Sequence, residues 1–182
     1  MGIFDILKKK KETEEEIMPR AKVKAKVNFE EVLTEIATLI SNNDEKVLSE
    51  IKELMSDLLK FQEDYKEIYK GRSFDLSMQP KKDIYWIAIA DILKRYGHVL
   101  YLDWKIERVD FINALSDFTG KFSEDFSYNS SKLDKDGDVP LWASEIDSQW
   151  KLFTLANYCV DSDCYFVFPC NEDMFISLNK LA

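Results

Sequence analysis

The sequence has few of the residues on which most catalytic and metal sites depend. Of its 182 residues only one is a histidine, His98, and only three are cysteines, Cys159, Cys164 and Cys170. The C-x4-C-x5-C spacing fits neither a zinc ribbon nor a redox C-x-x-C pair, so we expect reduced thiols packed as small apolar side chains. One histidine without a glycine-rich nucleophile turn also gives a Ser–His–Asp or Cys–His centre little to build on.

Glycine is scarce as well, and long apolar runs are missing. The five glycines are scattered and form neither a GxGxxG motif nor a P-loop, which excludes the common phosphate-cradling loops. From these absences we predict no cofactor and no metal site. No apolar run approaches the length of about 20 residues that spans a bilayer, and the short apolar patch after Met1 precedes lysines, the reverse of a secretion signal. We therefore expect a cytoplasmic protein without stable membrane attachment.

Negative charge is abundant and unevenly distributed. Residues 1–27 hold eight Lys or Arg and five acidic residues, whereas residues 28–182 hold 17 basic and 29 acidic residues, a net charge of −12. An acidic body repels phosphate backbones, so we expect no nucleic-acid partner and favour a protein partner with a basic surface. Blocks of like charge in residues 1–27 predict a charged, mobile tail. Residues 28–182 have the length of a single domain.

The spacing of apolar residues predicts a helix-rich α+β domain. The order is α-α-α-β-α-α-β-β-α, with three strands in a small mixed sheet that the helices cover. The caps expected for the first, second, third and last helices are Asn28, Asp44, Asp83 and Asn171, and Gly97 should end the third. The predicted helices are 28–40, 44–69, 83–96, 109–119, 140–150 and 171–178, and the predicted strands are 99–102, 153–160 and 164–168.

One loop resembles the calcium-binding loop of an EF-hand. From Asp134 to Glu145 it has Asp at positions 1, 3 and 5, Leu at position 8 and Glu at position 12, the alternation by which oxygen ligands converge on calcium. Position 6, where an EF-hand turns on glycine, is Val139, and Pro140 follows it. We therefore favour an acidic loop leading into a helix that starts at Pro140. Calcium binding through the Asp134–Glu145 loop is kept as an alternative.

Two short segments are the strongest candidates for function. Asp103-Trp104-Lys105 follows the first predicted strand, where α/β sheets often carry functional groups, and Asp161-Ser162-Asp163-Cys164-Tyr165 forms the tip of the predicted hairpin. Asp and Ser also make turns through their own backbone bonds, so a structural role competes with a binding role. The residues predicted to form a binding surface are Asp103, Trp104, Lys105, Asp161, Ser162, Asp163 and Tyr165.

The same residues carry a family resemblance. Trp86, Gly97, Leu102-Asp103-Trp104-Lys105 and Asp161-Ser162-Asp163-x-Tyr165, in this order and spacing, resemble the bacterial family known as domain of unknown function 6630. The resemblance covers roughly residues 80–182 and leaves the leading helices and the charged tail outside. It implies a compact bacterial cytoplasmic domain with no assigned activity, and it marks the two segments as the residues to test.

Composition and the lack of a catalytic constellation favour a non-catalytic protein-interaction module. A small acidic domain suits electrostatic capture of a basic partner, and an immunity-type protein that neutralises a basic toxin is one specific form. The enzyme alternative has Asp103, Lys105, Asp161 and Asp163 converging at a cleft, where burial would shift the pKa of the lysine and permit acid–base work. We assign no catalytic residue from the sequence.

Overall fold

The structure is a computed structural model that describes residues 4–6, 28–71, 78–160 and 163–181. It confirms the helix-rich α+β class and the predicted order of elements from the first helix onward. None of the helices in these described ranges has the length and hydropathy needed to cross a membrane. The elements are β1 (Phe4–Ile6), α1 (Phe29–Ile40), α2 (Glu45–Ser56), α3 (Leu58–Gly71), α4 (Lys81–Arg95), β2 (Leu100–Asp103), α5 (Arg108–Thr119), the 3-10 turn η2 (Ser130–Lys132), α6 (Val139–Gln149), β3 (Phe153–Tyr158), β4 (Cys164–Asn171) and α7 (Glu172–Leu181).

The sheet differs from the predicted mixed, three-stranded sheet in two details. Within the described residues it has four strands in the order β1-β3-β4-β2, and every neighbouring pair is antiparallel. The connection through α5 and α6 returns the chain, so β2 and β3 run in the same direction. They are not neighbours, because β4 lies between them and pairs antiparallel with both. The added strand is β1, from the segment predicted to be a tail. The rest of that segment, residues 1–3 and 7–27, lies outside the described residues.

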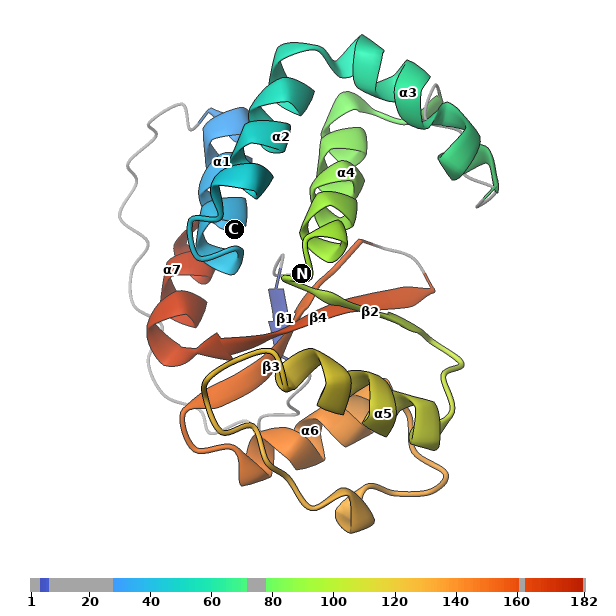
Figure 1. The fold of residues 1–182 in the computed structure, drawn as a ribbon, viewed down its shortest axis with the longest axis vertical. Helices are drawn as coiled ribbons and strands as arrows, with labels where there is room; N and C mark the ends of the chain where they lie inside the picture. Colours follow the sequence, from blue (N-terminus) through green and yellow to red (C-terminus); the bar gives the residue numbers. More distant parts are fainter. Residues whose placement is uncertain (1–3, 7–27, 72–77, 161–162, 182) are drawn as a thin grey trace, which may run out of the picture.

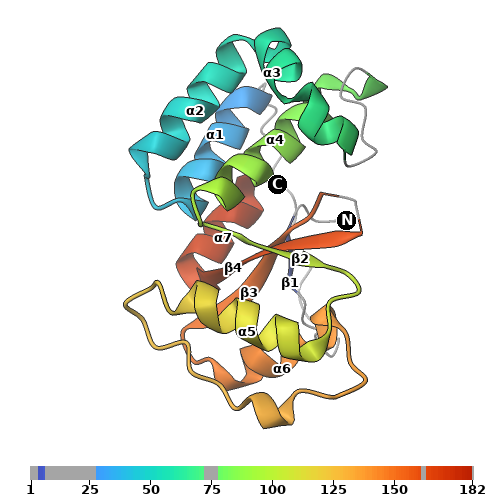
Figure 2. The same cartoon turned by 45° about the vertical axis from the view of Figure 1, so that its right-hand side comes forward.

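Helices cover both faces of the sheet, as Figures 1 and 2 show. The helices α1, α2, α4 and α7 lie over one face, and α5 and α6 lie under the other. Successive residues of β4 supply the two cores in turn, since Phe166 and Phe168 pack with the first group of helices and Val167 packs with the second. The central strands are therefore buried on both faces, which explains the near-continuous apolar run of β4.

Capping residues set several helix boundaries as predicted. The side-chain oxygens of Asn28, Asp44 and Asn171 each accept a backbone N–H from the first turn of the following helix, at 3.2, 2.9 and 2.8 Å. Gly97 ends α4 with a left-handed φ of 79°. Its N–H and that of His98 bond back to carbonyls in the last turn of α4, which stops the helix and directs the chain into β2.

The helix predicted at 44–69 is divided at Asp57 into α2 and α3. Asp57 leaves the helical conformation, with φ −146° and ψ 79°. Its carboxylate accepts the N–H of Lys60 at 2.9 Å, so the same residue ends one helix and caps the next. The apolar spacing alone did not reveal this break, because the periodicity of 3.6 residues continues on both sides of it.

The start of α4 also differs from the prediction, which made Asp83 its cap. The helix begins at Lys81, and the carbonyl of Pro80 accepts the N–H of Ile84 at 3.2 Å. Asp83 therefore lies inside the first turn, where its negative charge interacts favourably with the positive end of the helix dipole.

The long connection between α5 and α6 contributes to the core under the sheet. Phe126 and Leu133 are buried there. The indole N–H of Trp150 donates to the carbonyl of Phe126 at 3.1 Å, which holds the connection against the end of α6. The polar composition of residues 121–138 predicted a loop, and the two buried side chains show that this loop also packs.

Candidate functional site

The two candidate segments meet at one end of the sheet. In the antiparallel pair of β2 and β4, Asp103 lies opposite Cys164 and Leu102 lies opposite Tyr165. Beyond the last pair, the N–H of Trp104 donates to the carbonyl of Asp163 at 3.2 Å. Segments about 60 residues apart in sequence therefore lie together at one end of the sheet. Asp161 and Ser162, the first two residues of the second segment, lie outside the described residues.

Asp103 directs the chain out of β2 and towards α5. Its carboxylate accepts the N–H of Lys105 at 2.8 Å, and its carbonyl accepts the N–H of Ile106 at 3.1 Å. This turn leaves the indole of Trp104 half exposed. The ammonium of Lys105 lies 4.6 Å from the centroid of the Trp104 ring, a cation–π contact that orients both side chains. The tip of β2 thus presents an ordered aromatic ring to solvent.

Tyr165 connects this end of the sheet with the start of α6. Its ring is half-buried against the core that α5 and α6 form. Burial raises the pKa of Tyr165, and the carboxylate of Asp138 raises it further. The sequence had placed Asp138 only in the calcium-like loop, and no spacing connects it with Tyr165, which follows 27 residues later. The fold therefore adds one carboxylate to the predicted surface.

The described charged groups of the two segments lie at the surface. Asp103, Lys105 and Asp163 are all exposed. A lysine used in acid–base work is normally desolvated, because burial is what brings its pKa towards neutrality. Lys105 is exposed, and its ammonium lies over the Trp104 ring. Such an arrangement can hold a partner's side chains through charge and stacking contacts.

Two aspartates of the calcium-like loop accept backbone N–H groups of the turn and of α6. Asp134 accepts the N–H of Asp136 at 3.1 Å, and Asp138 caps α6 by accepting the N–H of Leu141 at 3.0 Å. The indole N–H of Trp142 donates to the carbonyl of Asp134 at 2.7 Å and holds the turn against the helix. Across the described ranges, no group of three or more His, Cys, Asp and Glu side chains is arranged to hold a metal ion. Asp134 and Asp138 therefore build the turn and the helix start.

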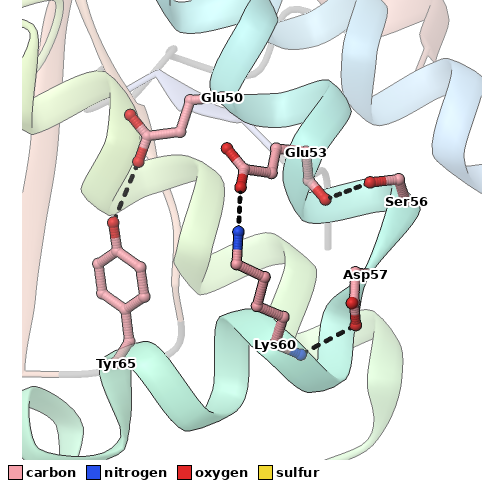
Figure 3. A network of polar contacts seen from close by, with 6 residues as sticks. All are labelled: Glu50, Glu53, Ser56, Asp57, Lys60 and Tyr65. Carbon is pink, nitrogen blue, oxygen red and sulfur yellow. Dashed lines mark hydrogen bonds and ion pairs between the residues drawn. The ribbon is translucent and has the colours of Figure 1, made fainter.

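A second polar cluster, which sequence reasoning did not single out, ties α2, α3 and α4 together (Figure 3). Glu50 accepts a hydrogen bond from the Tyr65 hydroxyl at 3.2 Å and forms an ion pair with Arg95. The guanidinium of Arg95 lies 5.2 Å from the centroid of the Tyr65 ring. Next to them Lys60 pairs with Glu53 at 2.5 Å. No sequence pattern indicates this cluster, because Arg95 lies 45 residues from Glu50. Its contacts hold α3 against α2 and α4.

The chain matches the protein family described as a domain of unknown function (DUF6630) over residues 32–182. Among curated proteins and solved structures, none matches this chain. The match confirms the resemblance drawn from the two segments and extends it, because α2, α3 and most of α1, expected to lie outside, fall within the matched residues. The strand β1 precedes the match.

Proposed function

This chain belongs to the family described as domain of unknown function (DUF6630), and we propose that it is a non-catalytic protein-interaction module. Its partner has a basic surface. The observation that carries the proposal is the half-exposed indole of Trp104, against which the ammonium of Lys105 lies. The backbone of Trp104 is fixed at the end of β2, because its N–H donates to the carbonyl of Asp163. Exposed, ordered aromatic rings are typical of the residues that dominate binding energy at protein interfaces.

The net charge of residues 103–163 supports a basic partner. Residues 103–163 carry 13 acidic and six basic side chains, which is a net charge of −7. More than half of the net negative charge of residues 28–182 therefore comes from this stretch. A cationic partner would be attracted to it over a distance of about one Debye length, roughly 8 Å at physiological ionic strength. An immunity-type protein that neutralises a basic toxin is one specific form of this proposal.

We place the module in the bacterial cytoplasm as part of the same proposal. The three cysteines support a reducing compartment, since each carries a thiol rather than a disulfide. Burial raises the pKa of the Cys170 thiol to about 12, which suits a packed thiol and not a reactive one.

The proposal is tested by immobilising the chain and capturing proteins from a bacterial lysate. Trp104→Ala removes the exposed ring, and Leu152→Ala, which changes another highly exposed apolar residue, serves as the matched control. We expect a Lys- and Arg-rich protein to be retained by the wild type and by the control. Loss of a central Trp typically costs about 2 kcal/mol or more of binding free energy, so retention by Trp104→Ala should fall at least about thirtyfold.

Salt dependence is the second readout of this experiment. Raising the salt concentration from about 50 to about 500 mM should weaken the complex, because exposed charges are screened. Retention that changes neither with salt nor with Trp104→Ala would contradict the proposed surface and the proposed partner chemistry.

A further inference from the structure

The helix α3 follows α2 directly, with a break in the helical conformation at Asp57. The N–H of Asp57 donates to the carbonyl of Glu53 at 3.1 Å, which continues the backbone bonds of α2. Its carbonyl accepts the N–H of Phe61 at 3.2 Å, and its carboxylate accepts the N–H of Lys60 at 2.9 Å. The N–H of Asp57 therefore belongs to α2, whereas its carbonyl and carboxylate belong to α3. Rotation about its N–Cα bond would turn α3 without breaking these bonds.

The position of α3 sets it apart from the helices that cover the sheet. In Figures 1 and 2 it extends beyond the ends of α2 and α4, at the end of the molecule away from the sheet. Of its side chains that the structure describes, only Phe61 and Tyr69 are buried, whereas seven residues of α4 are buried. A helix with few buried side chains can separate at a lower cost in free energy than the helices of the core.

The packing between α2 and α3 leaves a partly open cavity of about 120 Å³. Its lining includes Leu54 of α2 and Phe61 of α3. Four carboxylates also line it, those of Glu50, Glu53, Asp57 and Asp64. Side chains that face a void lose the dispersion contacts of a close-packed interface, and carboxylates repel one another. The contact between α2 and α3 is therefore not close-packed, and its acidic lining opposes closure.

Two tyrosine hydroxyls fasten α3 to its neighbours. Phe61, Tyr65 and Tyr69 are spaced four residues apart on one face of α3, and the rings of Phe61 and Tyr65 stack with their centroids 4.4 Å apart. The Tyr65 hydroxyl donates to Glu50 of α2 at 3.2 Å (Figure 3). The Tyr69 hydroxyl donates to Asp91 of α4 at 2.5 Å. The aromatic face of α3 is thus tied to two different helices through hydroxyl–carboxylate bonds.

We infer that α3 is a hinged helix, which opens about Asp57 as an intact helix while α2, α4 and the sheet stay folded. The hydroxyl bonds of Tyr65 and Tyr69 are the latch that keeps it closed. A hinge needs a residue that absorbs a change in backbone angles, and Asp57 already lies outside the helical conformation. Opening presents the aromatic face of α3 to solvent, a surface on which Phe61 and Tyr69 are buried in the closed state.

Native-state hydrogen exchange of the full chain, followed by NMR at low urea concentrations, tests the hinge. The opening that exposes the amides of residues 61–69 should have an equilibrium constant at least about tenfold larger than the one that exposes the amides of α4. It should also depend less on urea, because one helix exposes less surface than the whole domain. Amides of α3 with the same protection and urea dependence as those of α4 would overturn the proposal, since α3 would then leave only on global unfolding.

A double variant tests the latch. Tyr65→Phe combined with Tyr69→Phe keeps both rings and removes both hydroxyls. Tyr128→Phe is the matched control, because it removes a tyrosine hydroxyl that bonds to Ile112 of α5, on the other side of the sheet. A hydrogen bond is typically worth about a fivefold change in an equilibrium constant, so exchange in α3 of the double variant should be at least about twentyfold faster. Exchange in α4 of the double variant and in α3 of the control should not change.

Two results with the double variant would contradict the latch. Unchanged exchange in α3 would show that the hydroxyls do not hold it closed. Equal acceleration in α3 and α4 would show that the substitutions weaken the whole domain. The wild-type comparison of α3 with α4 needs no substitution, so it decides on the hinge even if the double variant does not fold.

Discussion

At the scale of single residues, three of the four tryptophans hold distant segments through their indole N–H groups. Trp86, Trp142 and Trp150 each donate to a main-chain carbonyl, at 2.5, 2.7 and 3.1 Å, and the acceptors lie 73, 8 and 24 residues away. Each ring adds apolar area to the fold while its single donor is satisfied. Trp104 differs, since its ring is half exposed. This contrast supports the proposal that Trp104 contacts a partner.

Asp147→Ala should destabilise the protein strongly. The carboxylate is almost fully buried and accepts the N–H of Leu155, which the substitution would leave buried without a partner. We expect the free energy of unfolding to fall by about 2–4 kcal/mol, measured by urea denaturation. Asp147→Asn keeps an acceptor oxygen and should lose less. The exposed Asp173→Ala is the control and should change stability by less than about 0.5 kcal/mol; a similarly small loss for Asp147→Ala would contradict the buried role.

Alkaline pH should destabilise the protein through Cys170. Burial raises the pKa of this thiol from 9.0 to about 12, so the folded chain keeps it neutral where the unfolded chain ionises it. The stabilisation is complete below pH 9 and is lost as the pH rises from 9 towards 12, at about 1 kcal/mol per pH unit. Burial raises the pKa of Tyr158 as well, so ionisation of this phenol in the unfolded chain lowers the stability further above pH 10.

The urea midpoint measured between pH 8 and pH 10 checks the alkaline prediction. Cys170→Ala removes the thiol and should flatten the pH dependence between 9 and 10, where Tyr158 contributes little. An equally steep fall in Cys170→Ala would show that another group is responsible.

At the scale of elements, the aspartates before α6 have the spacing of calcium ligands but form a turn and cap the helix. The carboxylate of Asp138 caps α6, and the carbonyl of Asp134 receives the indole of Trp142. Gly137 allows this close approach, since a Cβ there would lie 2.7 Å from the indole nitrogen of Trp142. The spacing of aspartates that resembles an EF-hand therefore coincides with what a tight turn and an N-cap require.

Calcium should leave the thermal midpoint of the protein unchanged. The carboxylate of Asp138 already bonds the first turn of α6, and Val139 stands where an EF-hand loop has glycine. The measurement is a thermal melt with excess calcium and with chelator, followed by tryptophan emission, with magnesium as the control cation. Calcium at a hundredfold excess over its Kd would add about 2.7 kcal/mol of stability. A midpoint raised by calcium alone would contradict this prediction.

At the scale of the whole molecule, the sheet couples the two cores. Successive residues of β3 serve opposite faces, since Leu155 packs with α5 and α6 while Ala156 packs with α1, α2 and α4. Neither group of helices can keep its core if the central strands separate. The layers therefore form one cooperative unit, although the two clusters of buried side chains are distinct.

A single unfolding transition should follow from this coupling. Trp86 reports on the core above the sheet and Trp142 on the core below it. Variants in which one of these is the only core tryptophan, the others being replaced by Phe, should give urea midpoints that agree within error. A difference larger than about 0.5 M, which for a typical urea dependence is about 1 kcal/mol, would show that one layer unfolds first.

Local interactions explain the parts of the fold that could be predicted from the sequence. A helix cap depends on bonds within three residues, so Asn28, Asp44 and Asn171 were identified correctly. The left-handed turn at Gly97 is equally local. Asp57 was missed although its bond to Lys60 is also local, because an aspartate inside a helical pattern is more often solvated than a break.

The sequence by itself determined the class, the order of the elements and the two segments that resemble the family. The antiparallel hairpin of β3 and β4 was also predicted from the sequence, whereas only the tertiary structure decided that β1 and β2 flank it. The pairing of β2 with β4 brought Trp104 to Asp163, and the fold gave Tyr165 its neighbour Asp138. It also decided that β1 pairs with the outer edge of β3. The reason is that strand pairing and side-chain contacts join residues that are far apart in the chain. These residues approach one another only when whole faces of the sheet are buried together.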